Sequence, residues 1–296
     1  MKTIIIGASG IIGYKLFKTL KERKIKVIGT YSKNKKPELV KFNILKDNVK
    51  KKIKINEEDN VIILTAISNP TWVYKNPKIS NNLNIIATKK IIDDLKIVNC
   101  KIFFMSSVEV FDGKKGNYNE ASKPNPLNLY GKQKLFIEKY LKKNTKKHCI
   151  IRTSFIVGDE PKQRCPVKLT YETLLLENAL MAKDNFFAIT SAKDLCMSIY
   201  KILYNKNLRD IDICHLSSKE KICRTTLATH VINFSKLGYK MNYSKTLFKF
   251  INYSEPRGRL NNLVSSNSIV KQFRFKNAKI IIKNKIKMIE RKIWMQ

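Results

Sequence analysis

The chain has 296 residues, 43% of them hydrophobic, and its 59 lysines and arginines outnumber 23 acidic residues to give a formal net charge of +36. This length allows one large α/β domain, or a nucleotide-binding domain with a smaller lobe. Because the lysines are scattered along the whole chain, we interpret the charge as a compositional bias and expect no specific nucleic-acid partner. No apolar run is long enough for a membrane span, so we expect a cytoplasmic protein without a transmembrane segment.

Cysteines and histidines are dispersed along the chain. None of the six cysteines belongs to a C-x-x-C pair, and the three histidines are isolated from them and from each other. We interpret the cysteines as buried thiols of a reducing compartment, and we expect no metal to take part in the chemistry.

The N-terminal stretch has the pattern of a strand, a glycine turn and a helix. Residues 2–6, which end in three isoleucines, are expected to form a strand. Three glycines follow at three-residue spacing, and residues 11–23 have one apolar face. Glycines let the backbone approach a pyrophosphate, and a helix N-terminus presents free N–H groups. We therefore predict a dinucleotide site formed by Gly7, Ser9, Gly10, Ile11, Ile12 and Gly13.

The choice of cofactor depends on the residues that come after the second expected strand, residues 24–30. No acidic residue stands where an NAD enzyme would bind the ribose 2′-hydroxyl. Ser32 and Lys33 could instead meet a 2′-phosphate, which favours NADPH over NADH. In so lysine-rich a chain, a lysine at this place can also be accidental.

Two later strands carry polar residues toward the same edge of the sheet. Residues 60–65 are expected to form a strand, and its last residue, Thr65, and the following Ala66 are expected to face the cofactor. Residues 101–106 are expected to form another strand, which leads into Ser107. Tyr130 and Lys134, four residues apart, share one helix face. A nearby ammonium lowers a phenol pKa, so Tyr130 is a candidate general acid.

The order of these motifs resembles that of the extended short-chain dehydrogenases/reductases. The segments 106–113, 117–120, 125–131 and 152–158 are similar to dTDP-4-dehydrorhamnose reductase and related sugar-nucleotide reductases. The resemblance implies an α/β fold, with a Rossmann doubly wound parallel sheet and a small C-terminal substrate lobe. Residues 1–158 would then form the NADP-binding domain, and residues 159–296 mostly the lobe, with about 185–216 returning to the Rossmann domain.

The resemblance also implies an activity, reduction of a keto group on a nucleotide-linked sugar by NADPH, in dTDP-rhamnose or other polysaccharide biosynthesis. Tyr130 would protonate the oxygen and Ser107 would hold it, while Lys134 would lower the tyrosine pKa and anchor the nicotinamide ribose. The further residues that it implies are Thr153 near the nicotinamide and Phe155, Val108 and Glu109 around the substrate. Arg257, or alternatively Arg259, would reach the phosphates of the nucleotide sugar. Val108 and Glu109 replace the Asp-Tyr of the family, and Glu109 faces either a sugar hydroxyl or solvent.

Several alternatives stay open. An NAD-dependent epimerase or dehydratase of nucleotide sugars would use the same scaffold, and so would a non-catalytic NADP-binding regulatory subunit; a homodimer is also considered. Residues 168–183 are expected to form one amphipathic helix. The basic tail, residues 276–296, would lie on a membrane surface or, as we favour, close the substrate lobe or a subunit contact. The sequence does not identify the sugar, the nucleotide or the stereochemistry.

Overall fold

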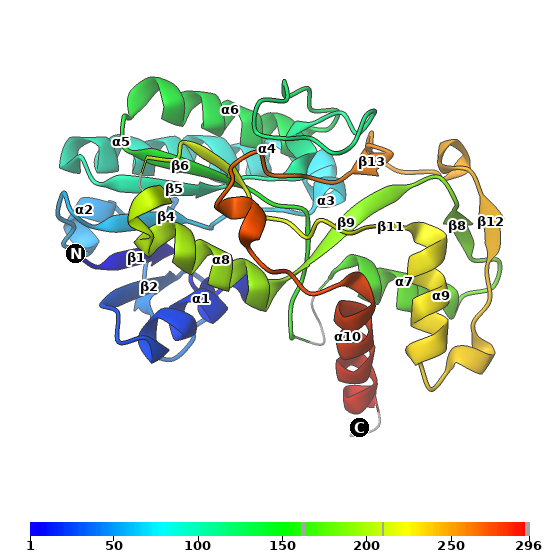
Figure 1. Cartoon of the computed structure of the whole chain (residues 1–296). Coiled ribbons are helices and arrows are strands. Elements are labelled where there is room, and N and C mark those ends of the chain that lie inside the picture. Colours follow the sequence, from blue (N-terminus) through cyan, green and yellow to red (C-terminus); the bar gives the residue numbers. More distant parts are fainter. Residues whose placement is uncertain (161–163, 209, 294–296) are drawn as a thin grey trace.

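The computed structural model describes residues 1–160, 164–208 and 210–293 (Figure 1). A seven-stranded parallel sheet forms its centre, in the order β10-β6-β5-β4-β1-β2-β3. Strand order reverses between β1 and β4, and open α/β sheets bind ligands beyond the carboxyl ends of the strands at such a point. The predicted Rossmann-type fold is confirmed. The strands are β1 Thr3–Ile6, β2 Val27–Tyr31, β3 Val40–Lys41, β4 Asn60–Ile63, β5 Lys101–Met105, β6 His148–Arg152 and β10 Ile213–His215.

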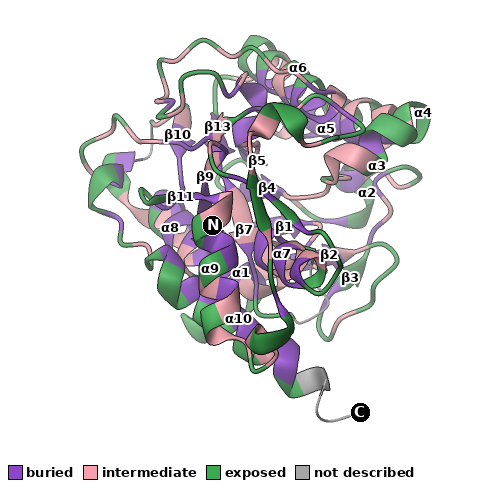
Figure 2. Cartoon of the chain, turned by 90° about the vertical axis from the view of Figure 1, so that its right-hand side faces the viewer, coloured by how far each residue is buried: buried purple, intermediate pink, exposed green. Residues whose placement is uncertain are grey.

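Isoleucine-rich strands form this sheet because helices cover both of its faces. On β1, Ile5 lies in one hydrophobic core, while Ile4 and Ile6 on the opposite face lie in another. Helices α1 Ile11–Glu22 and α8 Ala192–Tyr204 cover the first face, below the sheet in Figure 1. The other face is covered by α2 Val49–Lys52, α5 Thr88–Val98 and α6 Leu129–Asn144. Figure 2 shows the buried strands enclosed by helices with exposed outer faces.

A second lobe lies at the right of Figure 1. Its larger sheet joins β9 Phe186–Ser191 to three strands, β7 Phe155–Val157, β11 Lys221–Cys223 and β13 Leu260–Asn261, and its smaller sheet pairs β8 Leu180–Ala182 with β12 Ser244–Thr246. Helices α7 Pro166–Leu174, α9 Arg224–Phe234 and α10 Ala278–Ile293 complete it. The short helices of the chain are α3 Pro70–Lys75, α4 Pro77–Asn81, the π-helix η1 Asn82–Ala87, and the 3₁₀ turns η2 Val108–Val110, η3 Lys206–Leu208, η4 Gly238–Lys240, η5 Phe248–Phe250 and η6 Val270–Gln272.

The tail forms the helix α10, which closes this lobe. Its apolar face, including Ile282 and Ile286, is buried in one core with α7, α9 and β9. Among the described residues, no helix has the length and apolar character needed to cross a bilayer.

One expected helix needs correction, and the expected domain boundary stays a prediction. The helix expected over 168–183 was wrong: α7 ends at Leu174, and a turn with Asn178 in the left-handed region (φ 59°) leads into β8. Leu175 and Leu176 of the apolar run are exposed, so the run does not continue a buried face. The domain boundary at 158 stays a prediction. Of residues 185–216, which were expected to return to the first domain, α8 and β10 lie with the first sheet, whereas β9 lies in the sheet of the second lobe.

Candidate active site

A cavity of about 600 Å³ lies between the carboxyl ends of the central strands and the second lobe. A cavity of this size suits a small molecule or cofactor. Most of the predicted site residues line it, namely Gly7, Ser9, Gly10, Ile11, Ile12, Gly13, Ala66, Ser107, Val108, Glu109, Tyr130, Lys134, Thr153, Phe155 and Arg257.

Close backbone approach explains the glycines of the first turn. Gly7 has a φ of +89°, where L side chains are strained. A Cβ at Gly13 would lie 2.4 Å from the Gly7 carbonyl oxygen, so only glycine allows α1 to begin this close to β1. Gly10 precedes α1 and supplies no side-chain cap, which leaves N–H groups of the first turn directed to the cavity. This cradle fits the pyrophosphate of a dinucleotide.

Three predicted cofactor residues do not line the cavity. Ser32 and Lys33 are exposed, and Asn34 lines the cavity in their place. Thr65 lies behind the glycine turn, because a Cβ built on Gly7 would meet the Thr65 hydroxyl oxygen at 2.5 Å. These residues were predicted because they follow a strand. That criterion gave the correct edge of the sheet, but it did not show which side chains face the cavity.

Ser107, Tyr130 and Lys134 meet at one end of the cavity. Ser107 follows β5, and its Oγ accepts a 3.2 Å hydrogen bond from the Glu109 N–H. Tyr130 and Lys134 are buried on the first turns of α6. The Lys134 ammonium donates to the Met105 carbonyl at 2.8 Å and lies 5.8 Å from the centre of the Tyr130 ring.

The acid–base properties of this group differ from the expected ones. Burial raises the pKa of Tyr130 well above its usual value, the nearby Glu109 charge raises it further, and only the hydrogen bond with Ser107 opposes them. Burial also lowers the pKa of Lys134 to about 8, against the charge of Glu138. In the protein alone, burial and Glu109 therefore set the direction of the Tyr130 pKa shift, and the role predicted for Lys134 stays a prediction.

Glu109 faces the cavity rather than solvent. Its side chain is buried, and its Oε2 accepts a 2.7 Å hydrogen bond from Asn128 Nδ2. Burial raises the pKa of this carboxyl, opposed by the bond from Asn128 and the charge of Arg257. Of the two orientations considered from the sequence, only the inward one is present.

Three arginines line the cavity, Arg164, Arg224 and Arg257. Arg257 Nη2 donates to Thr71 at 3.1 Å and forms an ion pair with the buried Glu255. Arg224, which sequence reasoning missed, begins α9, and its guanidinium lies 4.2 Å from the Phe187 ring centre. Burial lowers the pKa of Arg224. Among 59 basic residues, nothing in the sequence marks this one.

A buried polar chain fixes α6 against the ends of β5 and β6. Arg152 Nε and Nη2 donate to the two carboxylate oxygens of Glu138 at 3.0 and 2.7 Å, and Ser106 Oγ lies 2.5 Å from Glu138 Oε1. His215 Nδ1 lies 3.0 Å from two carbonyl oxygens, so this nitrogen is the donor and Nε2 accepts from Arg152 Nη1 at 3.4 Å. Glu138 is one turn beyond Lys134, so the chain sets the orientation of the Tyr130 helix.

Asn84 holds the loop that follows β4. Its side-chain oxygen accepts from the Ile67 N–H at 2.8 Å, and its Nδ2 donates to Gln133 Oε1 at 2.7 Å. Asn84 lies in the π-helix η1, a form that is often found near functional sites. The loop beside Ala66 is thereby tied to α6 between Tyr130 and Lys134.

The family model described as "RmlD substrate binding domain" matches residues 1–249. This chain belongs to that family. The predicted resemblance to extended short-chain dehydrogenases/reductases of the dTDP-4-dehydrorhamnose reductase type is thereby confirmed.

Relatives of this RmlD-family protein carry two kinds of name. It is 28% identical over 230 residues to "Methionine adenosyltransferase 2 subunit beta" of Xenopus tropicalis, covering 75% of this chain and 69% of the relative. It is 27% identical over 167 residues to an Escherichia coli O157:H7 protein named N-acetyl-alpha-D-glucosaminyl-diphospho-ditrans,octacis-undecaprenol 4-epimerase, covering 53% of this chain and 49% of that one.

Solved structures share the fold along almost the whole chain. A dTDP-4-dehydrorhamnose reductase of Clostridium acetobutylicum has a TM-score of 0.79 at 21% identity, covering 98% of this chain and 100% of its own. One of Bacillus anthracis, solved with NADP, has a TM-score of 0.76 at 19% identity over the full length of both chains. A UDP-glucose 4-epimerase of Thermotoga maritima has a TM-score of 0.79 at 15% identity, covering 99% and 100%.

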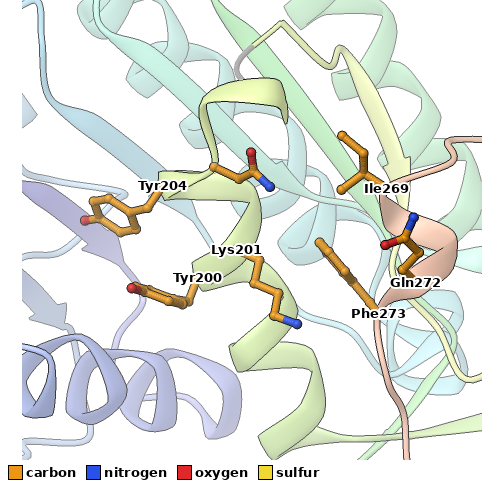
Figure 3. A pocket seen from close by; sticks show the side chains of 7 residues that line it. Tyr200, Lys201, Tyr204, Ile269, Gln272 and Phe273 are labelled. Atoms are coloured by element: carbon orange, nitrogen blue, oxygen red, sulfur yellow. The ribbon is translucent and has the colours of Figure 1, made fainter.

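A second hollow, of about 390 Å³, lies between α8 and η6 of this RmlD-family protein (Figure 3). Tyr204, which lines it, bonds through its hydroxyl to Thr3 Oγ1 at 2.6 Å, and Thr3 is the first residue of β1. The hollow therefore lies at the amino ends of the strands, opposite the glycine turn. Lys201 covers part of it, with its ammonium 5.0 Å from the Phe273 ring centre. None of the predicted site residues lines it.

Proposed function

We propose that this protein reduces a keto group on a nucleotide-linked sugar with NADPH. The observation that carries the proposal is one cavity that joins the glycine cradle to Ser107, Tyr130 and Lys134. Family membership supports a sugar-nucleotide reductase, and a structural relative was solved with NADP.

The bound nicotinamide would supply the hydride, and the residues of this chain would supply binding and the proton. The glycine cradle and the α1 N-terminus suit the pyrophosphate. Thr153 Oγ1 is buried at the cavity and has no hydrogen-bond partner within the described residues, so it is available to the nicotinamide amide. The preference for NADPH rests on the absence of an acidic residue after β2.

Tyr130 suits the role of proton donor because its phenol lies at the cavity beside Ser107 and the Lys134 ammonium. As hydride reaches the carbonyl carbon, the phenol proton would pass to the carbonyl oxygen, and Ser107 would hold that oxygen by a hydrogen bond. The phenolate that remains would be stabilised by the Lys134 ammonium.

The lobe side of the cavity suits the nucleotide. Arg224 and Arg257 present guanidinium groups there, and these match the oxygens of a diphosphate. Phe155, Phe187 and Tyr253 provide aromatic surface beside them. We propose that this part of the cavity holds the nucleoside diphosphate of the substrate.

The test monitors nicotinamide absorbance with NADPH or NADH and a panel of nucleoside-diphosphate 4-keto-6-deoxy sugars. We expect oxidation of NADPH, and loss of most turnover in Tyr130→Phe with cofactor binding retained. The matched control is Tyr140→Phe, on the same helix but bonded to Asp93 outside the cavity, which should leave turnover unchanged. Undiminished turnover in Tyr130→Phe would remove Tyr130 from the mechanism.

A subunit function without turnover is the second candidate, because several relatives are named as subunit beta of methionine adenosyltransferase 2. It predicts that the protein binds NADPH, oxidises none of it with the panel, and changes the activity of a purified methionine adenosyltransferase catalytic subunit. An altered sugar without net oxidation would instead indicate the epimerase alternative.

A further inference from the structure

Glu109 has one carboxylate oxygen that nothing in the described chain binds. Its Oε2 is bound by Asn128, whereas Oε1 receives no hydrogen bond within the described residues. The side chain is only 7% exposed, yet it lines both the main cavity and the small hollow beside Arg224 and Arg257. Oε1 is not one of the fully buried polar atoms that lack a partner, so it is open to the cavity, where it can accept a hydrogen bond from a ligand.

The position of this carboxyl is fixed by its neighbours. Asn128 caps α6 through the Gly131 N–H at 2.9 Å, and its Nδ2 also donates to the Pro256 carbonyl at 3.3 Å. Gly131 lies directly on the Glu109 backbone, because a Cβ there would stand 2.0 Å from the Glu109 carbonyl oxygen. The glutamate therefore cannot move away from the start of α6.

The same carboxyl lies beside the groups proposed to hold the reacting carbonyl. The Glu109 N–H donates to Ser107 Oγ, and the Glu109 charge acts on Tyr130. If the carbonyl oxygen of a substrate binds to Ser107 and Tyr130, one of the two ring carbons that flank the keto carbon lies toward Glu109. In a 4-keto pyranose these neighbours are C3, which carries a hydroxyl, and C5, which carries the ring oxygen and therefore no donor.

We propose that Glu109 selects the substrate by accepting a hydrogen bond, through Oε1, from a hydroxyl or amino group on C3 of the keto sugar. This inference rests on the proposed function. A carboxylate accepts hydrogen bonds and donates none, so the site takes keto sugars with a donor at C3 and rejects those without one.

The test compares a nucleoside-diphosphate 4-keto-6-deoxy sugar with its 3-deoxy analogue. For the natural protein we expect kcat/KM to favour the 3-hydroxy sugar roughly 10- to 100-fold, and the Kd values from calorimetry to differ in the same direction. In Glu109→Gln the amide oxygen would face the Asn128 NH₂ and the amide nitrogen would face the cavity, which replaces the acceptor by a donor. This variant should lose the preference, and so should Glu109→Leu.

Asp112→Asn is the control, because Asp112 lies in the same segment but bonds Tyr118 and Asn125 away from the cavity. It should retain the preference. Equal kcat/KM and equal Kd for the two sugars in the natural protein would overturn the inference while leaving the reductase in place, and so would a preference that survives in Glu109→Gln. Discrimination in binding without turnover would support the inference and refute the reductase. Failure of both sugars to bind overturns the inference as well.

Discussion

Replacing Arg152 by methionine should lower the free energy of unfolding by about 3–5 kcal/mol. Arg152 and Glu138 are each 2% exposed, and two charge-assisted hydrogen bonds join them. At roughly 1.5–3 kcal/mol for each such bond, the loss agrees with the cost of leaving a buried carboxylate without its cation. In the variant, Glu138 would keep only the Ser106 hydroxyl, and His215 Nε2 would lose its donor.

Urea unfolding followed by circular dichroism measures this change. The entropy of unfolding of a 296-residue chain is roughly 0.6 kcal/mol/K, so the thermal midpoint should fall by about 5–8 °C. Lys21→Met is the control, because its ion pair with Glu38 is about half exposed and should contribute less than about 1 kcal/mol. The double variant Arg152→Met/Glu138→Leu should recover much of the loss, since it removes both charges of the pair. A loss below about 1 kcal/mol in Arg152→Met, or a double variant less stable than the single one, would refute this reasoning.

Three further predictions concern the cavity. Gly13→Ala should cost roughly 1–3 kcal/mol of stability and weaken NADPH binding in a fluorescence titration, because its Cβ would meet the Gly7 carbonyl; unchanged binding would contradict this. Arg224→Gln should weaken UDP or dTDP binding about tenfold or more in calorimetry without changing NADPH binding, whereas Arg23→Gln, on the outer surface, should change neither. Burial lowers the pKa of Lys134 to about 8 from 10.5, so the destabilisation by its buried charge is complete below pH 8 and is lost as the pH rises to 10.5. The free energy of unfolding of the natural protein, relative to that of Lys134→Met, should therefore rise between pH 8 and 10.5. A difference that does not change with pH would show that the lysine is solvated.

Local sequence patterns were sufficient to predict the central sheet and one end of the cavity. After a polar first residue, the strands β1, β4 and β5 are continuous apolar runs, as expected of parallel strands covered on both faces. The glycine spacing predicted a turn that only a small residue can form, and the order of Ser107, Tyr130 and Lys134 placed all three at one edge of the sheet. These features depend on neighbours within one or two elements.

Features that depend on distant contacts were not predictable in this way. Arg224 lies in the cavity because Asn185 and Phe187, far earlier in the chain, hold its guanidinium. The raised pKa of Tyr130 arises from burial and from Glu109, and neither follows from the four-residue spacing to Lys134. Most strands of the second lobe have only two or three residues, which is too short for a periodic pattern to develop.

The route of the chain between the two sheets limits how chimaeras with relatives can be made. After β9 in the lobe, the chain returns to the central sheet. There α8 packs beside α1, and β10 extends the sheet beyond β6; the chain then enters the lobe again at β11. Exchanging everything beyond residue 158 would therefore replace part of the central sheet and its helical cover together with the second lobe. A graft limited to the second lobe needs two separate inserts, one that ends at β9 and one that begins at β11. The native α8 and β10 are kept between them, and so are Val270 and Phe273, which pack in the first core.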